Sequence, residues 1–430
     1  MKKNVILIIS ITVLLSLFAA SGVFAQEDDI TISFTWWGDT DRHEIYNSIV
    51  DMFEEEYPNI KVERPFGSWN QYWDKLATQI AGGNAPDVVG MHQRFVSDYA
   101  PRGALLDLQE YVDSGVLDLS HVPDSVKEGG VVNGNLYMVA QGVTTTGYMY
   151  NTKTFDDLGV EYPNMDWTYE EFAAKAREVQ AVAEEQGREI WGVGDDSTLF
   201  MPQFAYFARS KGEEVYTNDG KLGFTQETVE EWFNYWKELR DDGVIPDMAT
   251  TVEYTSAPLE QNLFTTQKTA IGTVPANQLW LYQEQFSEGK INIVRMPHFA
   301  DGRPGEYIEG SYLAVTSGSD HPEAAARLIS FFINDSEAQQ LFMLEQGVPP
   351  TTTAQERISD KLTPVQQRII DFVSYTLEIA EKSAYPPSGS TEVTSEFEEV
   401  AQAVGFGSMT PAEGAEEFMS SAEEILARNR

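Results

Sequence analysis

Apolar residues recur at two different spacings in the part of the chain that follows the N-terminal apolar run. The segment "ITISFTW" alternates apolar and polar side chains, which is the period of a β-strand with one buried face. Beyond Asp41 the spacing becomes three to four residues, which is the period of a helix, and the two periods then alternate. The elements predicted in this way are strands at 30–36, 59–63 and 85–91 and helices at 41–57 and 69–80.

This β-α-β-α-β order predicts a parallel sheet with right-handed crossovers. In open α/β sheets, ligands bind beyond the carboxyl ends of the strands. Here those ends are followed by "WWGDTDRH", "RPFGSWNQYW" and "MHQRF", which mix aromatic with hydrogen-bonding side chains. Three neighbouring loops of this composition predict one polar and aromatic surface.

The rest of the chain continues to alternate strands and helices. Asn133-Gly134 predicts a hairpin, and Thr168 with Glu171 predicts a capping box that opens a helix to about Gln186. A second strongly periodic helix is expected at 225–243. Strand character returns between 268 and 296, and the remainder reads as mainly helical. The chain shows no internal repeat and no low-complexity linker.

The N-terminus predicts export from the cytoplasm. Two lysines, a short apolar run and "VFA" at 23–25 make residues 1–25 a signal peptide; the alternative is an uncleaved membrane anchor. The chain contains no cysteine, so it has no disulfide, no thiolate metal site and no lipid-bearing cysteine. The mature protein is therefore expected outside the cytoplasm, in the periplasm or at the cell surface.

Composition and motifs exclude several classes of function. A net charge of −39 repels nucleic acid and anionic membranes, and a solvated acidic coat explains the scattered acids. No nucleophile elbow, phosphate loop, dinucleotide fingerprint or zinc-binding helix motif occurs, and the 5 histidines lack metal-ligand spacing. We therefore expect no cofactor and no metal. A carboxylate pair for glycoside hydrolysis stays open, because 68 acids offer many pairs.

The tryptophans divide into core and surface candidates. Trp73, Trp232 and Trp236 lie on apolar helix stripes and are expected in the core. Trp69 and Trp280 adjoin presumed loop ends, where an exposed indole favours stacking on the C–H face of a sugar ring. Trp36 is expected to end its strand and pack, whereas Trp37 is expected to stack on the ligand; both are kept in the predicted ligand-binding set. The hydrogen-bonding groups beside these indoles are Asp39, Arg42, His43, Asn70, His92, Gln93 and Arg94.

Longer segments resemble a known family. "FEEEYPNIKVE", "SWNQYWDKLATQIAGGNAPDVV", "VNGNLYMVAQGVTTTGYMYNT" and "LEQGVPPTTTA" resemble the extracellular solute-binding proteins of carbohydrate ABC importers, which are similar to maltose-binding protein. The resemblance implies the α/β, two-lobed (type II) periplasmic-binding-protein fold, with a mixed sheet flanked by helices in each lobe and the ligand in a cleft between lobes. It places 26–142 plus 268–309 in the N-terminal lobe and 143–267 plus 310–430 in the C-terminal lobe.

The resemblance also implies a function. The protein would be a monomer, not an enzyme, that captures a mono- or oligosaccharide and delivers it to a membrane permease. The double tryptophan followed by Arg42-His43 is closest to members that bind oligosaccharides from pectin-type polysaccharides. We expect Arg42 or Arg94 to pair with a sugar carboxylate; Arg42 could instead pair with Asp39 or Asp41. The rival functions are a secreted polysaccharide-active enzyme and a receptor for polyamines or metals.

The family's loop positions complete the predicted ligand-binding set. The loop after the first strand and the loop after "PDVV" supply the candidates of the first lobe, as named above. Those predicted elsewhere are Gln203, Tyr206, Trp280, Glu309, Tyr312 and Tyr385.

Overall fold

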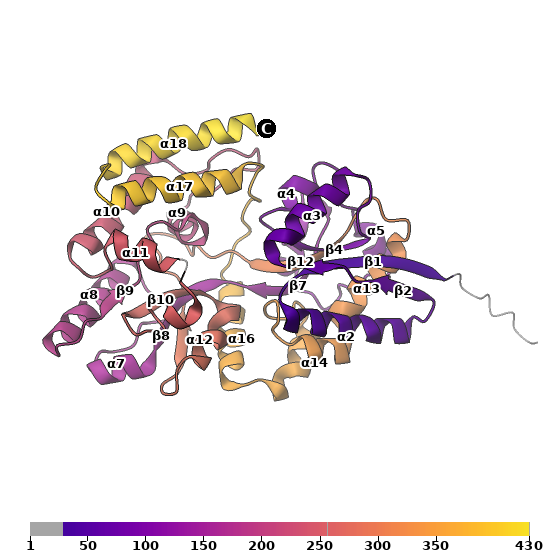
Figure 1. Cartoon of the computed structure of the whole chain (residues 1–430), viewed down its shortest axis with the longest axis horizontal. Helices are drawn as coiled ribbons and strands as arrows, with labels where there is room; N and C mark the ends of the chain where they lie inside the picture. The colour runs from indigo at the N-terminus through magenta and orange to yellow at the C-terminus, as the bar shows by residue number, and fades with distance from the viewer. Residues whose placement is uncertain (1–28, 256, 430) are drawn as a thin grey trace, which may run out of the picture.

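The computed structural model describes residues 29–255 and 257–429, which form two lobes side by side (Figure 1). The predicted signal peptide at 1–25 lies outside these residues. Each lobe is built on its own mixed β-sheet with helices packed against it. This arrangement confirms the predicted α/β fold with two lobes.

The sheet of the first lobe has the strand order β2-β1-β4-β12-β7, with the short β3 also paired to β1. β1 runs parallel to β2, β3 and β4, whereas β12 runs antiparallel to both β4 and β7. The parallel part therefore comes from the β-α-β-α-β segment predicted from the sequence. The strands are β1 (Ile30–Trp37), β2 (Ile60–Glu63), β3 (Phe66–Gly67), β4 (Val88–His92), β7 (Val139–Thr144) and β12 (Glu309–Val315).

The sheet of the second lobe has the order β11-β8-β10-β9. β8 pairs antiparallel with both β10 and β11, and β9 adds a parallel edge to β10. These strands are β8 (Thr146–Asn151), β9 (Trp191–Val193), β10 (Thr269–Pro275) and β11 (Ile291–Val294). A separate hairpin pairs β5 (Val131–Val132) with β6 (Asn135–Leu136), and the positive φ of Asn133 and Gly134 confirms the predicted turn.

Helices cover both sheets. In the first lobe, α2 and α13 lie below the sheet in the view of Figure 1, and α3 and α4 lie above it. In the second lobe, α10, α17 and α18 pack together above the sheet. The helices are α2 (Thr40–Glu56), α3 (Trp69–Ala81), α4 (Val96–Tyr99), α5 (Gln109–Asp113), α6 (Asp124–Glu128), α7 (Thr152–Leu158), α8 (Tyr169–Glu185), α9 (Ala205–Ser210), α10 (Gln226–Asp241), α11 (Met248–Thr255), α12 (Leu279–Glu284), α13 (Pro322–Asn334), α14 (Ser336–Phe342), α15 (Thr352–Ile358), α16 (Pro364–Leu377), α17 (Ser390–Gly405) and α18 (Pro411–Arg428).

The predicted lobe boundaries are wrong in their second half. Residues 268–309 were assigned to the first lobe, yet β10 and β11 are central and edge strands of the second sheet. β12 lies inside the first sheet between β4 and β7, and α13 packs on it, so the segment from β12 through α13 belongs to the first lobe, whereas α17 and α18 pack in the second. The hydrophobic period of a strand shows which face is buried but not which strands are its neighbours, and here the pairing decides the lobe.

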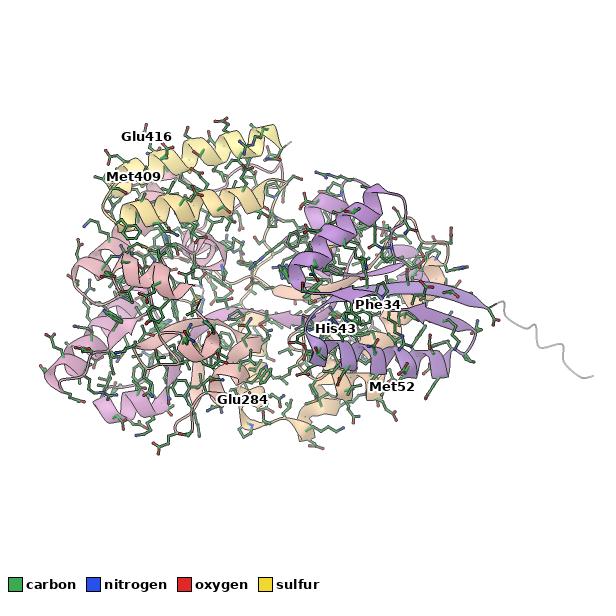
Figure 2. All side chains as sticks on the ribbon, in the orientation of Figure 1. Phe34, His43, Met52, Glu284, Met409 and Glu416 are labelled. Carbon is green, nitrogen blue, oxygen red and sulfur yellow. The ribbon has the colours of Figure 1, made fainter. Side chains whose placement is uncertain are left out.

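The local predictions agree with the structure. Thr168 and Glu171 form the predicted capping box at the start of α8, and Trp73, Trp232 and Trp236 are buried. Side chains of the apolar stripes fill the interior: Phe34 is fully buried under the first sheet, whereas Glu416 points outward from α18 (Figure 2). In the described part of the chain, no helix is long and apolar enough to span a membrane.

Gly90 in β4 is required by the close approach of an indole. A Cβ at this position would lie 2.9 Å from Cζ3 of Trp37, whose ring is held by three other aromatic rings. We expect Gly90→Ala to lower the free energy of unfolding by about 1–3 kcal/mol, because the packed ring has little room to move. Gly194→Ala is the control, since no atom lies within 4 Å of the added methyl group, and urea unfolding measures both. Equal midpoints for the two variants would contradict this account.

Candidate functional site

The two lobes are joined by chain segments that lie next to one another. β7 passes into β8 through Thr145, whose hydroxyl lies 2.8 Å from that of Thr376 at the end of α16. Residues 306–308 lead from the second lobe back to β12. A third segment, residues 380–387, runs between the lobes toward α17 and is called the strap below (Figure 1). The segments are therefore placed so that the lobes can move about them.

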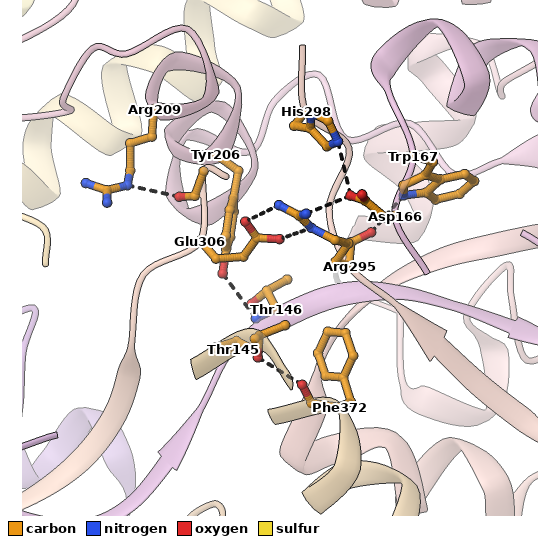
Figure 3. Close-up of polar contacts among 12 residues, drawn as sticks. Thr145, Thr146, Asp166, Trp167, Tyr206, Arg209, Arg295, His298, Glu306 and Phe372 are labelled. Carbon is orange, nitrogen blue, oxygen red and sulfur yellow. Dashed lines mark hydrogen bonds and ion pairs between the residues drawn. The ribbon is translucent and has the colours of Figure 1, made fainter. Parts of the chain in front are cut away.

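A buried ionic network fixes the second of these segments to the second lobe (Figure 3). Arg295, which follows β11, donates to both carboxylate oxygens of Glu306 at 2.6 and 2.8 Å and to Asp166 at 2.7 Å. Arg209 donates from Nε to the carbonyl of Gly305 at 2.9 Å and is completely buried. The network thus sets the position of Tyr307 and Glu309, which follow it in the chain.

An interlobe cavity opens beside these segments. It encloses about 820 Å³ of empty space, part of it open to solvent. The first lobe lines it with the loop after β4, with α6 and with Tyr312, and the second lobe lines it with Met201, Val215 and Tyr216. The strap and residues 307–309 complete the wall. Of the predicted site residues, the cavity brings together Gln93, Arg94, Glu309, Tyr312 and Tyr385.

A cation and a carboxylate lie together in this cavity. Glu309 is buried and accepts a hydrogen bond from Oγ1 of Thr146 at 2.9 Å. Burial raises the pKa of Glu309, while the charge of Arg94 and the Thr146 hydrogen bond oppose that rise. Arg94 is exposed, and in the described part of the chain no other side chain holds its guanidinium group by a hydrogen bond or an ion pair. Its five N–H donors are therefore available to a ligand.

An aromatic cluster lies at the end of the first sheet, and its member His92 directly precedes the cavity residue Gln93 in the chain. Trp69 contacts Trp37, Trp73 and His92 edge-on, with ring centroids 5.0–5.6 Å apart. Its indole is 36 % exposed, whereas Trp37 is only 5 % exposed. The expectation that Trp37 presents an open face to the ligand is therefore wrong, because α3 covers that side of β1, and Trp69 is the exposed indole. Burial lowers the pKa of His92 to about 3, so its ring is neutral beside Trp69.

The polar residues that follow β1 serve the first lobe itself. Asp39 is the N-cap of α2 and accepts from the backbone N–H of Arg42 at 3.0 Å. Arg42 forms an ion pair through Nε with Glu345 at 2.8 Å, so its ion-pair partner is Glu345 and not Asp39 or Asp41. Trp36 is buried as expected, and its Nε1 donates to Nδ1 of His43 at 2.9 Å. None of these four predicted site residues lines the cavity described above.

The other described candidates are not among the residues that line the cavity: Trp37, Trp69, His92, Gln203, Tyr206 and Trp280. Gln203 and Tyr206 are buried in the second lobe, where Gln203 donates to Thr273 and the Tyr206 hydroxyl accepts from the backbone of Thr146. Trp280 lies on α12 and packs, partly buried, against the hydrophobic core. The Asn70 side chain lies outside the described part of the structure.

Sequence reasoning missed several residues of the cavity wall. Tyr216 and Tyr307 have buried hydroxyl groups without a hydrogen-bond partner among the described residues, and Glu128 and Lys382 add one charge of each sign. Only the topology brings these residues together, since they come from α6, a second-lobe hairpin, a crossing segment and the strap. The described residues contain no group of three His, Asp or Glu side chains placed to hold a metal ion.

Comparison with known proteins identifies the family. The model of the family described as bacterial extracellular solute-binding protein matches residues 48–365. The chain belongs to this family. It has the two-lobed fold of this family, and the cavity between its lobes is the candidate site for the solute.

Solved structures and curated relatives agree with this assignment. An extracellular solute-binding protein family 1 from Alicyclobacillus acidocaldarius is 27 % identical, with a TM-score of 0.77 over 93 % of this chain and 99 % of that one. A periplasmic oligogalacturonide binding protein from Yersinia enterocolitica is 23 % identical, with a TM-score of 0.78 over 93 % and 100 % of the chains. The diacetylchitobiose binding protein DasA of Streptomyces coelicolor is 24 % identical over 285 residues, 64 % of this chain and 63 % of that protein.

Proposed function

We propose that this protein is the substrate-binding component of an ABC-type sugar importer, which captures a mono- or oligosaccharide in the interlobe cavity and delivers it to a membrane permease. The observation that carries the proposal is the cavity itself, whose wall combines side chains of both lobes. The sugar-binding relatives in the same family support the carbohydrate class.

The composition of the cavity wall explains how a ligand could favour closure of the two lobes. A ligand that contacts Arg94 on the first lobe and Tyr216 on the second makes both contacts only when the lobes are close together. Such differential contacts shift the population from open to closed, and the closed surface is what the permease would distinguish. A micromolar affinity needs about −8 kcal/mol. A few buried hydrogen bonds and one stacked indole are sufficient for that value.

We propose further that the sugar is acidic. Arg94 and Lys382 line the cavity, and within the described residues neither has an ion pair, although the protein carries 68 acidic side chains. A carboxylate-bearing saccharide supplies the missing partner, and the Yersinia protein of the same fold binds oligogalacturonide. Arg42, the other candidate for this role, is committed to Glu345.

A calorimetric titration tests the proposed function. Saccharides, neutral and uronate-containing, are titrated in parallel with polyamines, and each mixture is afterwards assayed for new reducing ends. We expect binding of a saccharide without turnover. Binding of polyamines alone would contradict the carbohydrate class, and release of reducing ends at enzymatic rates would contradict a pure binding function.

Trp69 provides a separate test of the sugar surface. We expect Trp69→Ala to weaken saccharide binding about fivefold to tenfold, because a stacked aromatic ring contributes about 1 kcal/mol beyond its buried area. Phe406→Ala is the matched control, since Phe406 is 58 % exposed at the far end of α17. Equal affinities of the two variants would show that Trp69 does not contact the ligand.

A further inference from the structure

A second, outer cavity lies on the other side of the strap. It holds about 1600 Å³ of empty space, part of it open to solvent, compared with about 820 Å³ for the interlobe cavity. Its wall again comes from both lobes: Asn133 of the hairpin turn belongs to the first lobe, and Thr217 and Asn218 belong to the second. The two cavities share four strap residues and Tyr216, so they are adjacent compartments of one cleft.

Tyr216 stands where the two compartments meet. Its side chain is 2 % exposed and lines both cavities, and its hydroxyl group has no hydrogen-bond partner among the described residues. A buried hydroxyl without a partner costs free energy, so a ligand atom that satisfies it gains affinity. Lys382 also lines both cavities, and among the described residues its ammonium group has one hydrogen bond, at 3.5 Å to the carbonyl of Val131.

The strap holds the two compartments open on either side of itself. Tyr385 donates to the carbonyl of Gly129 at 2.5 Å, and Ser388, just beyond the strap, donates to Asp98 at 2.9 Å, so its far end is tied to the first lobe. Arg303 of the second lobe pairs with Glu381, which ties its near end there. Because both ends are anchored, the strap is a fixed partition past which a ligand must extend.

The outer cavity has the chemistry of a site for hydroxyl groups. The amides of Asn133 and Asn218 both donate and accept, and one carboxylate oxygen of Glu213 is buried without a partner. Glu214, by contrast, is committed to Arg209 and Arg303. Lys382, at the junction, is the one cation in the wall of this compartment among the described residues. Hydroxyl-rich sugar units fit these groups.

We infer that the ligand is a linear oligosaccharide that occupies both compartments and passes Tyr216, so that the outer cavity selects for chain length. The inference rests on the proposed function, and it assigns Tyr216 and Asn218 as residues that determine specificity. A monosaccharide bound in the interlobe cavity alone would leave the outer groups without a partner.

The experiment measures affinity against chain length. Galacturonate and its linear dimer and trimer are titrated calorimetrically, with N-acetylglucosamine and diacetylchitobiose as a second series. We expect the trimer to bind at least tenfold more tightly than the monomer. Asn218→Ala should weaken the trimer about threefold to tenfold and leave the monomer unchanged, whereas Tyr216→Phe should weaken every chain that reaches the junction.

Thr250→Ala is the control, because Thr250 lines a different cavity of the second lobe that shares no residue with the cleft. Equal affinities for monomer and trimer, with no effect of Asn218→Ala, would overturn the inference while leaving the proposed function intact. Absence of binding in both series, together with binding of a non-sugar solute, would overturn the proposed function itself.

Discussion

Arg295→Met is expected to lower the free energy of unfolding by about 3–5 kcal/mol. The substitution leaves the Glu306 carboxylate, which is 1 % exposed, without the guanidinium group that it contacts at 2.6 and 2.8 Å. An unpaired charge at a buried position costs several kcal/mol, because the low-dielectric interior replaces its hydration. Urea denaturation followed by circular dichroism measures the loss.

Two further variants separate this cause from simple loss of volume. The double variant with Arg295→Met and Glu306→Leu removes both charges, and we expect it to recover most of the stability, since apolar residues replace buried ion pairs at little cost. Arg177→Met breaks a pair that is 37 % exposed on the arginine side, and it should cost at most about 1 kcal/mol. If the double variant were as unstable as the single one, the unpaired charge would not be the cause.

The same network links stability to the cleft. Glu306 precedes Tyr307, whose ring stacks on Tyr206 at 5.3 Å, and Glu309 opens β12 three residues later. Because the buried ion pair holds Glu306 in the second lobe, any hinge movement between the lobes is confined to the short stretch 307–308. Closure around a ligand requires such a short stretch between rigid bodies.

The early part of the fold could be predicted because its signals are local. The change from period two to period 3.6 between Trp36 and Asp41 sets the end of β1 and the start of α2, and the capping box of α8 needs only Thr168 and Glu171. The lobe assignment of β10–β12 could not be predicted in the same way. Those strands pair with partners 78 or more residues away, and their own sequence does not indicate which strand that partner is.

The candidate site was predicted in part for the same reason. Gln93 and Arg94 follow a parallel strand whose carboxyl end faces the cleft, so topology rules place them correctly. Trp37 is buried because aromatic side chains of α3 pack against its ring, whereas Trp69, which was also predicted to be exposed, keeps an open face. Tyr216 and Tyr307 carry no pattern in the sequence; only the folded chain shows that their hydroxyl groups are buried without partners in the cavity wall.

Arg94→Ala is expected to weaken binding of an acidic saccharide about tenfold to 150-fold. A hydrogen bond to a charged group contributes about 1.5–3 kcal/mol, and the Arg94 guanidinium has no competing partner among the described residues. Calorimetry with digalacturonate measures the loss, which should shrink as salt concentration rises, because exposed charges are screened.

The matched controls use the other arginine of the strand-end loops and a conservative change. Arg42→Ala removes an ion pair with Glu345 outside the cavity wall, so it should leave affinity for digalacturonate unchanged. Arg94→Lys keeps the charge but loses the bidentate geometry, and an intermediate affinity is expected. If Arg94→Ala bound digalacturonate as tightly as the unaltered protein, or lost a neutral disaccharide equally, the ligand carboxylate would not be recognised by Arg94. The proposal that the ligand is an acidic sugar would then be wrong. Lys382 alone could not replace Arg94, because an ammonium group is a point charge and does not form two parallel hydrogen bonds to a carboxylate.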